Sequence, residues 1–371
     1  MTRALNFGAG PAALPYAALE RAKAELLDFE GSGMSVMEHS HRGKVYEKVH
    51  HEAIALLREL LELDDDWAVL FVQGGASMAF AQIPMNFLPS GKTAEFVVTG
   101  AWGEKAVSEA EACAAFGAGK VRVAVSTKKD KSYTRVPKAS ELDFSGDAAY
   151  VHVTSNETIH GVQWALDPST AIPRTKAPLV CDMSSDILGH PIDASKFDLI
   201  YAGAQKNIGP SGVTIVCVKK DLLEAARRDI PAIFQYRTHA ENHSLYNTPP
   251  TFGIYLARNA LLWIKGEGGA RAMEERNVAK AHALYKAIDG SGGFYKCPVE
   301  ATSRSIMNVV WRLPTEELEE KFVKEATASR MIGLKGHRSV GGIRASLYNA
   351  VEPAWVEALA SFMGEFAKKN G

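Results

Sequence analysis

Short apolar runs alternate with helix-type repeats through residue 218 of the chain. Several runs are continuously apolar, as in residues 67–72, which is typical of strands covered on both faces of a sheet. Between the runs, apolar residues recur near every 3.6 positions, as at Val49, Leu57 and Leu61. This alternation predicts an α/β fold with a mostly parallel central sheet flanked by helices. The expected strands are residues 67–72, 95–99, 121–125, 149–153, 179–182, 198–201 and 213–218.

The pattern changes after about residue 265. A long polar helix pattern is followed by a mixture of strand-type and helix-type segments, which predicts a smaller α+β domain. A chain of 371 residues is long for one hydrophobic core, which also favours two domains. The expected elements of this region are a helix over 270–288, a strand over 306–311, a helix over 315–329, a strand over 342–347 and a helix after Pro353.

Composition and charge exclude some classes of partner. The chain is 46% hydrophobic and 23% charged, with a formal net charge of −1, so no global field attracts nucleic acid or a membrane surface. No apolar run approaches the ~20 residues that span a bilayer. The cysteines lie far apart and form no CxxC pair, which favours free thiols in a reducing compartment. We therefore expect a cytoplasmic protein, and the spacing of its histidines predicts no metal site.

A glycine-rich turn follows the first expected strand. Residues 73–77 read Gln-Gly-Gly-Ala-Ser and lead into a helix-type repeat. Glycines let the backbone approach a ligand closely, and the first turn of a helix offers free N–H groups to an anion. This pattern predicts a phosphate site at Ala76 and Ser77, although an ordinary strand-to-helix turn has the same appearance.

Asp182 closes one expected buried strand, and Lys206 follows another. Small residues crowd both sides of Lys206, and desolvation there lowers the amine pKa toward the free base that Schiff-base chemistry needs. In an open α/β sheet, ligands bind outside the carboxyl ends of the strands, where Asp182 can pair with a cationic ring nitrogen. The alternatives are a lysine that reaches the surface and an aspartate that begins a turn. The phosphate turn, the acid and the lysine occur in this order along the alternating strands. All three together are expected by chance far less often than any one of them alone.

Arginine and histidine pairs occur near both ends of the chain. A substrate with a carboxylate and a phosphate carries nearly three negative charges, and arginine offers paired hydrogen bonds to either group. For any one of these residues, solvated surface charge is the better interpretation. The candidate anion-binding residues are His41, Arg42, His337, Arg338 and Arg344.

Two glycine-rich segments resemble nucleotide motifs but are rejected. Residues 8–13 resemble a dinucleotide fingerprint, but no strand is expected before them and Pro11 interrupts the turn. Residues 117–121 lack the first glycine of a P-loop and the Ser or Thr after its lysine.

Seven segments together resemble the phosphoserine aminotransferase family, whose members are class-V, fold-type-I enzymes dependent on pyridoxal 5'-phosphate (PLP). The match extends from residue 6 to about residue 350, which is nearly the whole chain. The segments that carry it are residues 6–11, 33–42, 156–161, 182–186, 201–212, 247–252 and 341–346.

The resemblance implies a large PLP-binding domain over residues 16–265 and a small domain that combines residues 1–15 with 266–371. It also implies a homodimer with shared active sites. The reaction would be a ping-pong transfer of an amino group from L-glutamate to 3-phosphohydroxypyruvate, giving O-phospho-L-serine and 2-oxoglutarate. Whether 4-phosphohydroxy-L-threonine is a second substrate is left open.

The resemblance further implies a role for each candidate residue. Lys206 would form the Schiff base, Asp182 would pair with the pyridine nitrogen, and Trp102 would stack on the ring. Thr158 would donate a hydrogen bond to the phenolic oxygen of the cofactor. The cofactor phosphate would be bound by Ala76, Ser77 and Gln205, and by Asn247 and Thr248 of the other subunit. The substrate would be bound by His41, Arg42, His337, Arg338 and Arg344.

Two alternatives to an aminotransferase remain at this point. The first is a cysteine desulfurase, which needs a reactive thiol, and only Cys297 beside Pro298 is a candidate. Nothing in the adjacent sequence would activate that thiol. The second is a phosphate-binding module without catalysis. Visible absorbance distinguishes this second alternative, because only a Schiff base absorbs there.

Overall fold

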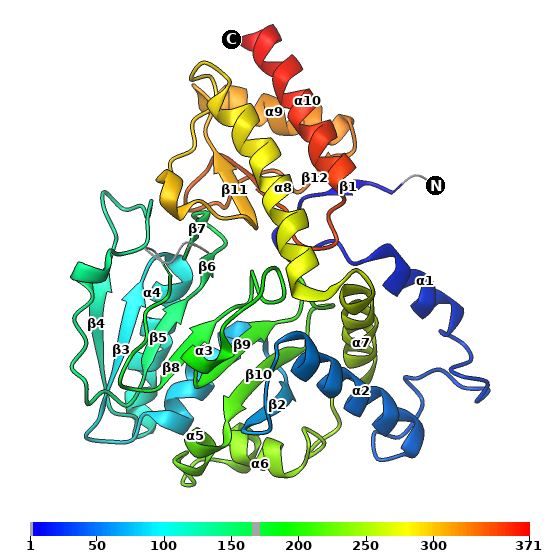
Figure 1. The fold of residues 1–371 in the computed structure, drawn as a ribbon, viewed down its shortest axis with the longest axis vertical. Coiled ribbons are helices and arrows are strands. Elements are labelled where there is room, and N and C mark those ends of the chain that lie inside the picture. Colours follow the sequence, from blue (N-terminus) through cyan, green and yellow to red (C-terminus); the bar gives the residue numbers. More distant parts are fainter. Residues whose placement is uncertain (1–2, 165–170) are drawn as a thin grey trace.

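The computed structural model describes residues 3–164 and 171–371, and its largest feature is a seven-stranded sheet (Figure 1). The strands lie in the order β2-β10-β9-β8-β5-β3-β4, and all neighbouring pairs are parallel except the two that β10 makes. The prediction of a mostly parallel sheet is therefore confirmed, and each expected strand is present. The strands are β2 (Trp67–Val72), β3 (Thr93–Val98), β4 (Lys120–Ser126), β5 (Val151–Thr154), β8 (Leu179–Asp182), β9 (Leu199–Gly203) and β10 (Thr214–Lys219).

Helices flank this sheet because its central strands are apolar on both faces. Every residue of β5, β8 and β9 is buried. Helix α4 packs on β3 and β4, α3 packs on β9, and α2 and α6 pack on β2. The helices of this layer are α1 (Tyr16–Ala24), α2 (Lys44–Leu60), α3 (Gly75–Phe87), α4 (Ala101–Ala112), α5 (Lys220–Glu224), α6 (Tyr236–Glu241) and α7 (Thr251–Gly266).

The last third of the chain forms a second layer, in yellow to red in Figure 1. All the elements expected after residue 265 are present, and a separate cluster of buried residues, including Phe322 and Met363, joins them. Thr315 begins α9 by accepting a hydrogen bond from the Leu318 N–H (3.3 Å), beside acidic residues that favour a helix start. The elements are α8 (Gly269–Asp289), β11 (Asn308–Trp311), α9 (Glu316–Ala328), β12 (Met331–Ile332), β13 (Ile343–Ser346) and α10 (Pro353–Asn370).

The N-terminal segment crosses from this second layer to the sheet. Strand β1 (Leu5–Asn6) pairs in parallel with β12, and the Ala12 N–H then donates to the Gln205 carbonyl (2.9 Å). One reason for rejecting residues 8–13 was therefore wrong, because a strand does precede them. That strand has only two residues, too few to produce a periodic pattern in the sequence.

A short hairpin completes the edge at which the parallel strands end. It consists of β6 (Asn156–Glu157) and β7 (Val162–Gln163), directly after β5. Across the described ranges, we find no helix with the length and apolar composition needed to cross a membrane.

Candidate active site

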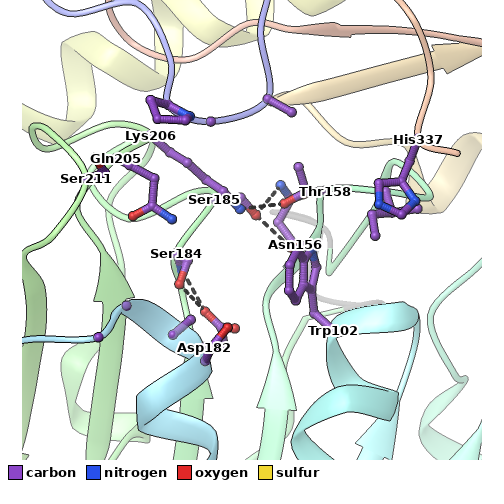
Figure 2. A pocket seen from close by; sticks show the side chains of 18 of the residues that line it. Trp102, Asn156, Thr158, Asp182, Ser184, Ser185, Gln205, Lys206, Ser211 and His337 are labelled. Carbon is purple, nitrogen blue, oxygen red and sulfur yellow. Dashed lines mark hydrogen bonds between the residues drawn. The ribbon is translucent and has the colours of Figure 1, made fainter.

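A cavity of about 460 Å³ lies at the carboxyl ends of β5, β8 and β9 (Figure 2). The N-terminal segment closes part of it through Ala9, Gly10 and Pro11. Residues from many separate parts of the sequence therefore meet there, as expected at the edge of a parallel sheet. The candidate residues that line it are Ala76, Ser77, Trp102, Thr158, Asp182, Gln205, Lys206, His337 and Arg344.

Lys206 extends into the cavity from the turn after β9. Its side chain is 9% exposed, and its Nζ donates a hydrogen bond to Thr158 Oγ1 (2.7 Å). Burial lowers the pKa of this amine to about 8, although the nearby Asp182 opposes the change. The neutral, nucleophilic form of this amine is therefore far more abundant near neutral pH than that of an ordinary lysine.

Asp182 is the last residue of β8, the strand adjacent to β9. Its Oδ1 accepts hydrogen bonds from the Ser184 N–H (2.8 Å) and Ser184 Oγ (2.6 Å). Burial raises the pKa of the Asp182 carboxyl, and the two bonds from Ser184 oppose that rise. Among the described residues, hydrogen bonds reach only Oδ1, which leaves Oδ2 for a group in the cavity.

Trp102 forms a wall of the cavity from the first turn of α4. Its ring centroid lies 5.8 Å from Lys206 Nζ and 6.4 Å from the ring of Phe80. The indole Nε1 is buried and has no hydrogen-bond partner in the part of the chain that the structure describes. The ring is therefore placed to contact a planar group held beside Lys206.

The glycine turn after β2 opens the start of α3 to the cavity. Gly74 has φ = +91°, and a Cβ there would lie 2.4 Å from Met78 Cβ, so only glycine fits. The first helical hydrogen bond is donated by the Met78 N–H to the Gly74 carbonyl (3.3 Å). The preceding N–H groups, including those of Ala76 and Ser77, are left for an anion.

The second layer contributes two basic residues, Arg344 and His337, on the opposite side of the cavity. Arg344 lies on β13, and its Nη1 donates to the Thr158 carbonyl (3.4 Å), while its buried Nε has no partner among the described residues. Burial lowers the pKa of Arg344, and burial followed by the charges of Arg344 and Arg338 lowers the pKa of His337. In Figure 2, His337 lies across the cavity from Lys206.

Five candidate residues lie outside this cavity. His41 and Arg42 are on the segment between α1 and α2, and Arg338 is exposed on the loop that carries His337. Asn247 lines a neighbouring cavity of about 350 Å³ that shares Gly74 with the main one, and the adjacent Thr248 is exposed.

Several cavity residues were not singled out from the sequence. Asn156, Ser184 and Ser185 lie just beyond the ends of β5 and β8, so the rule that located Asp182 could also have found them. Asn156 Nδ2 donates to Ser185 Oγ (2.8 Å) and to Asn308 Oδ1 (2.8 Å), which links the hairpin to the second layer. Residues 9–11 drew attention only as part of a rejected nucleotide motif and of the resemblance, because their placement in the cavity depends on β1 pairing with a distant strand.

The cysteine environments do not favour a thiol nucleophile. Burial raises the pKa of the Cys297 thiol above its usual range, and the Cys113, Cys181 and Cys217 thiols are raised by burial as well. None of the four lines the main cavity. The geometry therefore gives no support to the cysteine desulfurase alternative.

Comparisons with known proteins agree with this site. A family model described as aminotransferase class-V matches residues 4–359. A phosphoserine aminotransferase from Halalkalibacterium halodurans is 54% identical over 366 residues, which cover 99% of each chain. A phosphoserine aminotransferase from Bacillus subtilis is 51% identical over 370 residues, which cover 100% of each chain.

Solved structures give the same result. The phosphoserine aminotransferase from Bacillus circulans subsp. alkalophilus has a TM-score of 0.94 and 51% identity, covering 100% of this chain and 99% of that one. A PLP-bound phosphoserine aminotransferase from Trichomonas vaginalis has a TM-score of 0.92 and 40% identity, covering 98% and 100%. The resemblance found in the sequence is confirmed. The chain belongs to the class-V aminotransferase family and, within it, to the phosphoserine aminotransferases.

Proposed function

We propose that this chain is a PLP-dependent enzyme that transfers the amino group of L-glutamate to 3-phosphohydroxypyruvate. The observation that carries the proposal is the pairing of a buried amine, Lys206, with a buried carboxylate, Asp182, in one cavity. The relatives at 50–54% identity that are phosphoserine aminotransferases support the choice of substrates.

The residues present fit PLP. The open N–H groups at the start of α3, with Ser77 and Gln205, suit its phosphate. The unused Oδ2 of Asp182 suits its ring nitrogen, and the Trp102 ring suits stacking on its plane. Lys206 is the residue that would hold the cofactor covalently, and the Thr158 hydroxyl beside it suits the phenolic oxygen.

When bound, PLP supplies an electron sink for negative charge that develops at the substrate α-carbon. Lys206, with its pKa near 8, is matched to removing and returning the α-proton near neutral pH. Asp182 would hold a proton at the ring nitrogen of this cofactor. Arg344 and His337 orient the acidic groups of the substrate, so that the α-proton points toward the amine.

A homodimer with shared sites is part of this proposal. His41, Arg42, Asn247 and Thr248 lie outside the chain's own main cavity, and a second subunit would bring them to one. Exposed apolar side chains support such an interface, notably Leu27 (84% exposed) on the same α1–α2 segment. Other exposed apolar residues on or near these segments are Tyr16, Met34, Met37 and Tyr246.

The division into two domains remains a proposal as well. Residues 16–265 are assigned to a large domain, and residues 1–15 and 266–371 to a small one. Two separate hydrophobic clusters support this division, and Phe7 and Ala13 belong to the second cluster despite their place in the sequence. Met1, Thr2 and residues 165–170 lie outside the described residues. The cytoplasmic location stays a prediction.

The proposal is tested with purified protein. We expect PLP to produce yellow absorbance, and borohydride reduction followed by peptide mass spectrometry to place the cofactor on Lys206. We expect glutamate to react with 3-phosphohydroxypyruvate far faster than with hydroxypyruvate. Reduction that tags another lysine would overturn the assignment of Lys206, and equal rates with both keto acids would overturn the choice of substrate. The keto acid of 4-phosphohydroxythreonine, assayed in parallel, decides whether it is a second substrate.

A further inference from the structure

Helix α4 begins without a capping side chain of its own. Its N-cap residue is Gly100, which makes no side-chain hydrogen bond, and such a helix start leaves several N–H groups without partners. The Glu157 carboxylate occupies this position from the β6 strand. It accepts hydrogen bonds from the Trp102 N–H at Oε2 (3.0 Å) and from the Gly103 N–H at Oε1 (2.9 Å). A residue 55 positions away thus caps the helix that carries Trp102.

The space for this carboxylate exists because residue 100 has no side chain. A Cβ on Gly100 would lie 2.3 Å from Glu157 Cδ. Gly100 has φ = 177°, an extended conformation open to any residue, so glycine is required here for space rather than for backbone geometry. The Glu157 side chain, which has no exposed surface, fills the position that an ordinary N-cap side chain would take.

Glu157 and its neighbour in sequence hold different parts of the cavity wall. Thr158 accepts the hydrogen bond from Lys206, while Glu157 holds the N–H of Trp102, whose ring lies 5.8 Å from the same lysine amine. One dipeptide therefore places two walls of the cofactor cavity relative to each other.

We propose that Glu157 is a positioning residue that holds Trp102 in place for PLP by capping α4 across the cavity wall. This inference rests on the proposed function, because it takes PLP as the group that Trp102 contacts. Burial raises the pKa of Glu157 to about 7, and the two N–H bonds oppose the rise. The positive end of the helix dipole favours the ionised form at this position.

The direct test is the affinity of the PLP-free full chain for PLP, measured by visible absorbance in Glu157→Gln. The amide keeps the volume but turns an NH₂ group toward a backbone N–H, so one of the two bonds is lost. We expect the Kd for PLP to rise about tenfold, as the loss of one hydrogen bond to a charged group predicts. Glu104→Gln is the matched control, because Glu104 lies in the same helical turn but bonds to Lys128 and Tyr133. We expect it to leave the Kd for PLP within about twofold.

Two further variants distinguish positioning from general stability. In a Trp102→Ala background, Glu157→Gln should add little to the Kd for PLP, since its effect passes through Trp102. In a Glu157→Ala background, Gly100→Ser should restore much of the PLP affinity, because the vacated space then admits a serine that caps α4 itself. Glu157→Gln remains informative if Glu157→Ala does not fold.

Three outcomes would overturn the inference: an unchanged Kd in Glu157→Gln, losses that simply add in the Trp102→Ala background, and no recovery with Gly100→Ser in a folded Glu157→Ala protein. Failure of the unsubstituted chain to bind PLP would count against the proposed function instead, so the two failures are distinguishable.

Discussion

The cofactor end and the substrate end of the cavity differ in how completely one chain builds them. At the cofactor end, Lys206, Thr158 and Asp182 are buried, and each makes short hydrogen bonds within the chain. At the substrate end, Arg344 keeps a buried Nε without a partner among the described residues, and Arg338 is exposed. Apart from Asn247 and Thr248, which the proposed second subunit would supply, one chain therefore builds the cofactor end, whereas it leaves the substrate end open.

This difference has an electrostatic cause. The cofactor end balances the amine of Lys206 against the carboxylates of Asp182 and Glu157. The substrate end gathers basic residues: burial lowers the pKa of Arg344, and burial followed by the charges of Arg344 and Arg338 lowers the pKa of His337. Basic groups brought together favour an anionic ligand, so a substrate with acidic groups supplies the opposite charge at this end.

The largest effect should come from Lys206→Ala at the cofactor end. Loss of the amine removes both the covalent attachment and the proton carrier, so we expect turnover to fall by at least about 10,000-fold and the yellow absorbance to disappear. Lys206→Arg is the control, because it keeps the positive charge but cannot form a Schiff base. If Lys206→Ala kept both turnover and absorbance, Lys206 would not be the residue that holds the cofactor, and the cofactor end would not be where we place it.

A mixed dimer tests whether the open substrate end is completed by a second subunit. Lys206→Ala and Arg42→Ala chains are each expected to have little activity alone. If Arg42 serves the partner's cavity, a hybrid dimer contains one intact site, and random mixing should restore about a quarter of the normal activity. Differently tagged chains, unfolded together and refolded, provide the measurement. No recovery in isolated hybrid dimers would place Arg42 in its own subunit's site or in none.

The two ends also differ in how well sequence predicts them. Asp182, Lys206 and the turn before Ser77 follow apolar strands directly, so local pattern and the carboxyl-end rule locate all three. Glu157 escaped notice because its partners are N–H groups 54 and 55 residues away, and a backbone N–H has no signature in the sequence. The seven strands were predictable for the same local reason, whereas β1 and β12, with two residues each, were not.

At the substrate end, the sequence identified residues of the right chemical type to bind an anion, but it did not show which of them line the cavity. The candidate cations were recognisable as anion-binding groups, yet only His337 and Arg344 reach the main cavity. Arg42 and Arg338 are exposed, and exposure of a charged side chain is the ordinary condition of a protein surface. Sequence alone therefore could not separate ligand-binding arginines from solvated ones.

A smaller effect is expected from Arg338→Ala on the loop beside the cavity. If Arg338 binds the phosphate, kcat/KM should fall about 10- to 100-fold for 3-phosphohydroxypyruvate, mainly through KM, and much less for hydroxypyruvate. Lys335→Ala is the matched control, because Lys335 is another exposed cation near the base of the same loop, to which no phosphate-binding role is assigned. Equal losses with both keto acids would show that Arg338 does not recognise phosphate.

The smallest effect concerns the pH dependence of stability at the cofactor end. The pKa of Glu157 is about 7 in the folded chain and near 4.5 when unfolded, so the folded state binds the extra proton between these values. The stability that this proton contributes is fully present below about pH 4.5 and is lost as the pH rises through 7.

Urea unfolding of the PLP-free chain and of Glu157→Gln, at pH 6 and pH 8, measures this loss of stability. Relative to Glu157→Gln, the unsubstituted chain should have an unfolding free energy that is about 1 kcal/mol lower at pH 8 than at pH 6. If the difference in unfolding free energy between the two chains does not depend on pH, Glu157 keeps one charge state between pH 6 and pH 8. The cofactor end would then have the same charges over this whole range.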